Sequence, residues 1–123
     1  MIGTNVVIDN DCVVGDNCSF QTGAYIPTGS RIGDRVFLGP NASLTNDKTP
    51  LRTEYKLETI TVEDDVTIGS NATLMPGITV GEGAFIAGGA VVTKDVPAWH
   101  IAKGCPAVFE ELPESLKKPN RLG

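Results

Sequence analysis

Residues 67–92 read TIGSNATLMPGITVGEGAFIAGGAVV, and every sixth residue from Ile68 to Val92 is a large aliphatic residue. The same frame extends back almost to the start of the chain. Its members are Ile8, Val14, Phe20, Ile26, Ile32, Leu38 and Leu44, then Val62, Ile68, Leu74, Val80, Ile86 and Val92. Because 41% of the residues are apolar, thirteen apolar residues in thirteen places arise by chance about once in a hundred thousand trials.

A second position of the repeat is also restricted. The residue four places after each apolar one is small or β-branched. These residues are Cys12, Cys18, Ala24, Ser30, Val36 and Ala42, then Val66, Ala72, Ile78, Ala84, Ala90 and Val96. A period of six fits neither the 3.6 residues of a helical turn nor the alternation of an ordinary strand. It predicts an all-β solenoid of about five triangular coils, with three very short strands in each coil of eighteen residues.

The frame is interrupted between Leu44 and Val62, which are eighteen residues apart. Pro50 and Lys56 occupy the places that the frame reserves for core residues, and Pro is unfavourable in a strand that must pair on both sides. We therefore expect that one coil is interrupted by a protruding loop over about residues 47–59. Long loops on a regular scaffold tend to carry function, although an inert insertion is the alternative.

The C-terminal part of the chain leaves the frame after Val96. We predict a repeat domain over residues 1–107 and a C-terminal tail or cap over residues 108–123. Within the cap, residues 108–112 are predicted to form one short helical turn, with Phe109 and Leu112 covering the open end of the stack. A narrow core with two open ends also predicts end-capping or oligomerisation.

The composition of the chain argues against several classes of function. A net charge of −5 argues against a nucleic-acid partner, and no apolar run approaches the length of a membrane span. Residues 1–3 lead directly into the repeat, without the pattern of a secretory leader. Three cysteines are an odd number for a disulfide framework. We therefore expect a cytoplasmic protein with no membrane span.

The repeat resembles the hexapeptide-repeat acyltransferases. The most specific segments are IGDRVFLGPN at 32–41, LTNDK at 44–48 and VVTKDVP at 91–97. Together they are similar to the N-acetyltransferases that complete nucleotide-linked amino sugars for O-antigen and other surface polysaccharides. The resemblance implies a left-handed parallel β-helix and a homotrimer. It also implies that acetyl-CoA is the co-substrate and lies between neighbouring chains, that an acceptor sugar binds near the loop, and that no metal is needed.

The resemblance also implies which residues contact the co-substrate. These are Ser70, Gly88, Thr93 and Lys94. Ser70 and Gly88 are eighteen residues apart, so they stand one coil above the other at one edge, where small residues let the pantetheine arm approach the backbone. Lys94 is then placed to meet a phosphate. The alternatives are ordinary turn chemistry for Ser70 and Gly88 and a solvated surface side chain for Lys94.

The residues of the loop bear on the reaction type. Several hexapeptide transferases acylate hydroxyls with a His base in the interrupted coil, but the one His of this chain, His100, follows the repeat. A hydroxyl normally needs such a base, whereas a neutral amine attacks a thioester once it is oriented. The sequence therefore favours N-acetylation over O-acetylation.

Two loop residues are candidates for the catalytic site. The amide of Asn46 can accept a hydrogen bond from the amine and donate one to the oxyanion, and Asp47 is a second candidate to orient an ammonium. The alternative for Asn46 is a left-handed turn position at the start of the loop.

Other function classes stay open at this point. They are an O-acetyltransferase acting on a sugar hydroxyl and a non-catalytic β-helix that mediates assembly. A γ-type carbonic anhydrase is excluded, because its zinc site needs three His ligands and the chain has one.

Overall fold

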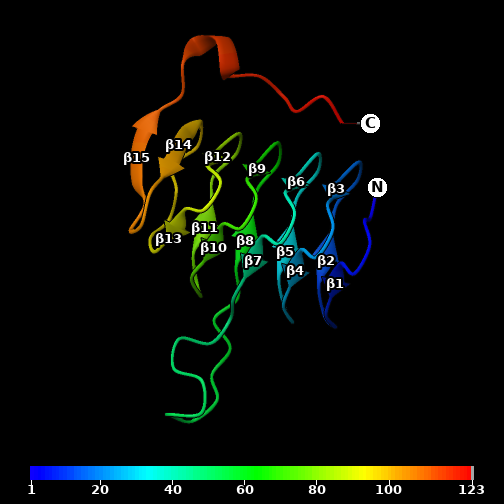
Figure 1. The fold of residues 1–123 in the computed structure, drawn as a ribbon, viewed down its shortest axis with the longest axis vertical. Coiled ribbons are helices and arrows are strands. Elements are labelled where there is room, and N and C mark those ends of the chain that lie inside the picture. The colour runs from blue at the N-terminus through cyan, green and yellow to red at the C-terminus, as the bar shows by residue number, and fades with distance from the viewer. Residues whose placement is uncertain (123) are drawn as a thin grey trace.

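The computed structural model describes residues 1–122 and shows a triangular prism built from three parallel sheets (Figure 1). Sheet 1 contains β1 (Val7–Ile8), β4 (Tyr25–Ile26), β7 (Ser43–Leu44), β10 (Thr73–Leu74) and β13 (Val91–Val92). Sheet 2 contains β2 (Val13–Val14), β5 (Arg31–Ile32), β8 (Thr61–Val62) and β11 (Thr79–Val80). Sheet 3 contains β3 (Ser19–Phe20), β6 (Phe37–Leu38), β9 (Thr67–Ile68), β12 (Phe85–Ile86), β14 (His100–Lys103) and β15 (Val108–Glu111).

The strand register confirms the period read from the sequence. Val7 pairs with Tyr25 and Ser19 with Phe37, one coil of eighteen residues away. The second residue of each strand points inward, and from Phe20 to Val92 these side chains are buried. The only helical element in residues 1–122 is the 3-10 turn η1 (Glu114–Leu116), and no helix there is long and apolar enough to cross a membrane.

Most corners of the prism turn through a residue with positive φ. The same place in the hexad is held by Asn17 (φ 59°), Gly23 (φ 77°), Asn41 (φ 60°) and Asn71 (φ 59°). Asn and Gly adopt this left-handed conformation at low cost. The corners after β7 and β13 lack it, since neither Asp47 nor Asp95 has a positive φ. The small inward residue next to it, such as Ala24 or Ala72, is fully buried because the narrow core leaves no room for a larger one.

The protruding loop occurs where the sequence predicts it, but it does not replace part of a coil. It connects β7 to β8, which lie on successive faces of one coil and are normally six residues apart. Here eighteen residues separate Leu44 from Val62, so the loop widens one corner and every face keeps its strand. Figure 1 shows the loop extending away from the prism on the side opposite the C-terminal segment.

The helical turn predicted over residues 108–112 is wrong. β15 instead pairs antiparallel with β14, with Ala102 opposite Phe109. β14 itself continues sheet 3 beyond β12, so the upper end of the stack is closed by a hairpin. Leu112 is buried and Phe109 packs against the core, which agrees with the predicted covering role of these two side chains.

The last described residues turn back over sheet 3. We call residues 112–122 the C-terminal strap; Figure 1 shows it running from the hairpin back along the prism. Asn120 fastens the strap. Its backbone N–H donates to Asp65 Oδ1 (3.0 Å), its side-chain amide donates to the Arg35 and Val66 carbonyls (2.9 and 3.1 Å), and its Oδ1 accepts from Thr67 Oγ1 (3.1 Å).

Candidate functional site

Four of the six predicted site residues share one place in the hexad. Asn46, Ser70, Gly88 and Lys94 all immediately precede the positive-φ place of a corner. They lie on two edges of the prism. We call the corner between sheets 1 and 2 the loop edge, the corner between sheets 3 and 1 the Ser70 edge, and the corner between sheets 2 and 3 the acidic edge.

The root of the loop is held by hydrogen bonds around Asn46. Its side-chain amide donates to the Thr28 carbonyl one coil below (3.2 Å), and its own carbonyl accepts from the Glu58 N–H (2.9 Å). The Glu58 carbonyl accepts from the Gly77 N–H one coil above (3.0 Å), and Thr45 Oγ1 donates to the Leu74 carbonyl (2.7 Å). The loop therefore leaves and rejoins the edge at one fixed point.

Asn46 does not have a positive φ, unlike the residues that turn the corners. The left-handed turn explanation for this residue is therefore wrong. Its amide is half-buried at the loop root, where one N–H holds the coil below. A side-chain amide has a second N–H and an oxygen, and neither has a hydrogen-bond partner among residues 1–122. The second N–H and the amide oxygen of Asn46 are therefore available to hydrogen-bond a ligand.

A hollow of about 280 Å³ lies within the loop and begins at Asp47, the residue after Asn46; Asn46 itself does not line it. The lining residues carry charged or hydroxyl groups as well as aliphatic stems, with both signs of charge: Asp47, Lys48, Thr49, Thr53, Glu54, Lys56 and Glu58. Asp47 Oδ1 accepts the Thr49 N–H (3.1 Å), and Lys48 Nζ lies 3.5 Å from Glu58 Oε1. The structure thus places Asp47, the sequence neighbour of Asn46, in a hollow whose charged and hydroxyl groups suit a hydroxyl- and amine-bearing molecule.

The Ser70 edge carries unpaired backbone donors. Within residues 1–122, neither the Ser70 N–H nor the Gly88 N–H donates a hydrogen bond, and both residues are exposed. The Ser70 carbonyl accepts from the Gly89 N–H (2.8 Å), which locks the two coils together. An added Cβ at Gly69 would lie 2.5 Å from the Gly88 nitrogen, so this edge also needs small residues to stack.

At the acidic edge, the corresponding backbone N–H groups do have hydrogen-bond acceptors. There the equivalent N–H groups of Asp16 and Asp34 each donate to the carboxylate one coil above, Asp34 Oδ1 and Asp64 Oδ1, at 2.8 Å. Glu82 N–H also donates to a carboxylate, here Glu63 Oε1 in the coil below (3.0 Å). Among residues 1–122 no carboxylate caps the Ser70 edge in this way, so its N–H groups are available to carbonyl oxygens of an extended ligand.

The four predicted co-substrate contacts do not share one edge. Thr93 and Lys94 lie at the loop edge, two coils above Asn46, whereas Ser70 and Gly88 lie at the neighbouring edge. Sheet 1 separates the two pairs. The structure therefore brings together Asn46, Asp47, Thr93 and Lys94 along one edge and leaves Ser70 and Gly88 on the other.

His100 is remote from the loop. It is the first residue of β14 in sheet 3, and its Nδ1 lies 2.9 Å from the Ala98 carbonyl. The loop leaves the prism between sheets 1 and 2, so His100 is not part of the same edge.

Comparison with known proteins identifies the family to which the chain belongs. The family model for bacterial transferase hexapeptide, six repeats, matches residues 11–46 and 59–94, more than half of the chain. The chain belongs to the hexapeptide-repeat transferases. The unmatched residues between the two segments are those of the loop. Repeats of this family form a left-handed parallel β-helix, so the predicted fold class and the resemblance to the hexapeptide-repeat acyltransferases are confirmed, while the finer likeness to amino-sugar N-acetyltransferases stays a prediction.

Among curated relatives, this hexapeptide-repeat transferase is similar to a provisionally named acetyltransferase of Schizosaccharomyces pombe. The two are 38% identical over an alignment 113 positions long, and the match covers 85% of this chain and 52% of that protein. It is also similar to the 2,3,4,5-tetrahydropyridine-2,6-dicarboxylate N-acetyltransferase of Staphylococcus aureus, at 41% over 75 residues, 61% of this chain and 30% of that protein. The chain thus spans about half or less of the length of these relatives.

Two solved structures have the same fold. A maltose O-acetyltransferase from Clostridium difficile 630 matches with a TM-score of 0.83 and 28% identity, over 92% of this chain and 66% of that one. A hexapeptide-repeat acetyltransferase from Vibrio cholerae, solved with acetyl coenzyme A, matches with a TM-score of 0.76 and 25% identity, over 92% and 71%.

Sequence reasoning missed Glu58 and Thr28, whose backbones hold the loop root. A signal for Glu58 was present. Ile60 falls in the small-residue frame and is fully buried, so the repeat resumes there and places Glu58 just before it. No periodic signal points to Asn120, whose partners lie 53 to 85 residues earlier.

Proposed function

We propose that this hexapeptide-repeat transferase moves an acetyl group from acetyl-CoA to the amine of a nucleotide-linked amino sugar. The observation that carries the proposal is the makeup of the loop edge. Asn46 presents an amide oxygen and an N–H that are unpaired within residues 1–122, it is followed by Asp47 in the lining of the loop hollow, and the chain's imidazole lies on another sheet. That arrangement suits a nucleophile that needs orientation rather than a base.

The proposed binding of the co-substrate uses both free edges. The Ser70 and Gly88 N–H groups donate to carbonyl oxygens of the pantetheine arm, as a neighbouring strand would. Lys94, exposed and without an ion pair in residues 1–122, meets a phosphate. Acetyl-CoA supplies the activated thioester. The acetyl-CoA complex of the similar Vibrio cholerae enzyme supports this choice of co-substrate.

Asn46 has two roles in the proposed reaction. Its Oδ1 accepts a hydrogen bond from the neutral amine and fixes the direction of attack. Its free N–H donates to the oxygen that gains negative charge as the new C–N bond forms. The amine then loses a proton to solvent, the C–S bond breaks, and the leaving thiolate takes up a proton. Asp47, which lines the loop hollow, attracts the acceptor's ammonium form before it is deprotonated.

The proposed assembly is a homotrimer in which sheet 1 of each copy faces the three-fold axis. The outward side chains of sheet 1 are uncharged: Val7, Tyr25, Ser43, Thr73 and Val91. Sheet 2 instead presents Arg31, and sheet 3 is partly covered by the strap. In this arrangement the Ser70 edge of one copy meets the loop edge of the next. Ser70 and Gly88 then reach the same groove as Lys94 and Asn46.

The testing experiment is acetyl-CoA turnover by the purified chain against matched pairs of nucleotide sugars, with an amine or a hydroxyl at the same carbon. We expect the mass of one acetyl group on the amine sugars only, in a product that survives hydroxylamine because it is an amide. A hydroxylamine-sensitive product on the hydroxyl sugars would identify an O-acetyltransferase. Absence of both turnover and CoA binding would identify an assembly module.

A further inference from the structure

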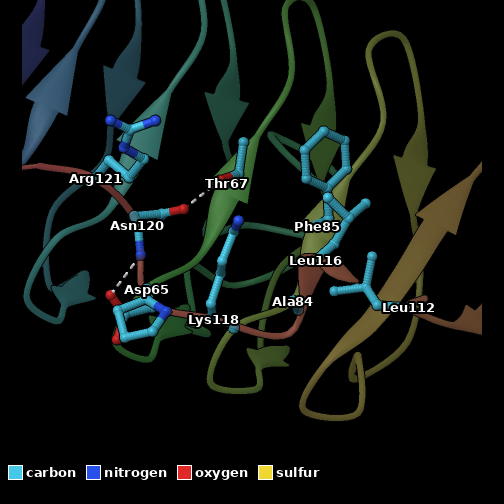
Figure 2. Close-up of a pocket in the computed structure, with 11 residues that line it drawn as sticks. Asp65, Thr67, Ala84, Phe85, Leu112, Leu116, Lys118, Asn120 and Arg121 are labelled. Carbon is cyan, nitrogen blue, oxygen red and sulfur yellow. Dashed lines mark hydrogen bonds between the residues drawn. The ribbon is translucent and has the colours of Figure 1, made fainter. Parts of the chain in front are cut away.

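A second hollow lies away from the proposed transfer site, under the C-terminal strap (Figure 2). Its volume is about 310 Å³, at the lower end of small-molecule sites, which measure about 300–1,000 Å³. It opens between the strap and the β9 and β12 strands of sheet 3, next to the acidic edge. The proposed transfer residues lie on the other two edges, so this hollow has a separate position in the fold.

The walls of the hollow are mainly apolar. Phe85 projects from the outer face of β12 with 38% of its surface exposed, although a large aromatic side chain normally gains by burial. Leu116 from the strap is also exposed, and Leu112 and Ala84 complete this side. Figure 2 shows Leu116 and Leu112 on the same side of the hollow as the Phe85 ring.

The opposite side of the hollow is cationic. Lys118 and Arg121 line it and form no ion pair within residues 1–122, whereas the neighbouring Lys117 is paired with Glu111 and Glu114. Figure 2 shows Lys118 extending from the strap between Asn120 and the Phe85–Leu116 side. The carboxylate that lines the hollow, Asp65, is already paired with Arg35, whose Nε lies 2.8 Å from Asp65 Oδ1.

The hydrogen bonds of Asn120 hold the strap in place and keep the hollow open. Asn120 makes four hydrogen bonds to the coils below, so Lys118 and Leu116 are held at a fixed distance from sheet 3 instead of collapsing onto it. A flat ring fits against Phe85, and an anionic group on that ring fits beside Lys118 and Arg121.

We infer that this hollow is a binding site for a small aromatic anion, of the class of a purine mononucleotide, distinct from the acetyl-transfer site. The ring stacks on Phe85 and the phosphate pairs with Lys118 and Arg121. The site belongs to the strap and sheet 3 alone, so binding requires neither acetyl-CoA nor an acceptor.

The test is isothermal titration calorimetry of the full chain with adenosine 5′-monophosphate, in the presence of saturating coenzyme A. We expect one binding event per chain. Adenosine alone and inorganic phosphate alone should each bind at least about tenfold more weakly, because each lacks one half of the recognition. No binding, or displacement of the mononucleotide by coenzyme A, would overturn the inference.

Matched variants locate the site. Lys118→Gln and Phe85→Leu should each weaken mononucleotide binding about tenfold, since one removes the charge and the other the flat ring. Arg31→Gln removes the same charge from the exposed face of sheet 2 and should leave binding unchanged. Thermal unfolding of each variant checks that the fold is intact. Equal binding by Lys118→Gln and the parent chain would contradict the inference.

Discussion

At the scale of the residue, much of the chemistry of this protein depends on one place in the hexad, the residue just before the positive-φ place of a corner. On the acidic edge the N–H at this place is capped by a carboxylate from the next coil, as at Asp34 and Asp64. On the Ser70 edge the same N–H is left open. On the loop edge the place is taken by Asn46, whose side chain holds the coil below and keeps two polar groups free. The acidic and Ser70 edges share the same left-handed corner backbone and differ in their side chains, whereas at the loop edge the backbone differs as well, because Asp47 has no positive φ and the loop begins there.

Replacing Asn46 by Ala is expected to lower kcat by about 10²–10³, the range for losing one preorganised donor to an oxyanion. Because Asn46 also anchors the loop root, Thr45→Val is the control: it removes the 2.7 Å bond to the Leu74 carbonyl but leaves the amide in place. We expect Thr45→Val to keep most of the activity. If steady-state kinetics showed equal losses of kcat in both variants, the role of Asn46 would be structural and the proposed role at the oxyanion would be contradicted.

The Asp65–Arg35 pair predicts a dependence of stability on acid. The Arg35 guanidinium, with the Asn120 N–H, holds the pKa of Asp65 below its usual value. A lowered folded-state pKa stabilises the protein above the unfolded pKa of about 3.9, and this contribution is lost as pH falls through the folded value. Asp65→Asn should therefore lower the unfolding temperature at pH 7 more than at pH 3. Thermal denaturation at the two pH values with an equal difference would contradict this origin.

At the scale of the element, the strands could be predicted because a solenoid repeats its core contacts at a fixed sequence spacing. Ile68 and Ile86 are buried for the same reason as Phe20 and Leu38, so one frame locates them all. The β14–β15 hairpin could not be predicted in this way. Its antiparallel pairing of Ala102 with Phe109 carries no hexad signal, and five residues rich in apolar and acidic types fit a helical turn equally well.

Replacing Ile86 by Ala is expected to cost about 2–5 kcal/mol of unfolding free energy, because the side chain is fully buried and the stacked coils cannot collapse into the cavity. Thr61→Ala, on the outward face of β8, should change it by less than about 0.5 kcal/mol. Chemical denaturation measures both. A surface-sized effect for Ile86→Ala would mean that the inward frame is misassigned.

At the scale of the whole molecule, the proposed site is divided between two edges that sheet 1 separates. Ser70 and Gly88 lie on one side of that sheet, and Asn46 and Lys94 on the other. The sequence indicates that Ser70 and Gly88 stack, since they are eighteen residues apart. It does not indicate which edge of one copy faces which edge of the next copy in an assembly. The facing edges depend on how the copies pack, and hence on the outward residues of sheet 1, which follow no strict pattern.

A charge on the outward face of sheet 1 is expected to disrupt the proposed trimer. Thr73→Arg places a guanidinium in the middle of that face, where three copies would bring like charges together in a desolvated interface. Thr61→Arg makes the same change on sheet 2 and should leave assembly unchanged. Light scattering should report a smaller species only for Thr73→Arg, with loss of acetyl transfer. A trimer for Thr73→Arg, or a monomer for the parent chain, would contradict the arrangement.

The central claim is direct attack by an amine without a protein imidazole, and the most direct test is the pH dependence of kcat/KM with two amino-sugar acceptors whose amines differ in pKa. We predict that activity rises with pH on a limb that moves with the acceptor, since kcat/KM reports the ionisation of the free substrate amine. His100→Ala should leave both profiles unchanged. A limb fixed near 6.5 for both acceptors, the range of an imidazole, and abolished in His100→Ala would contradict the account.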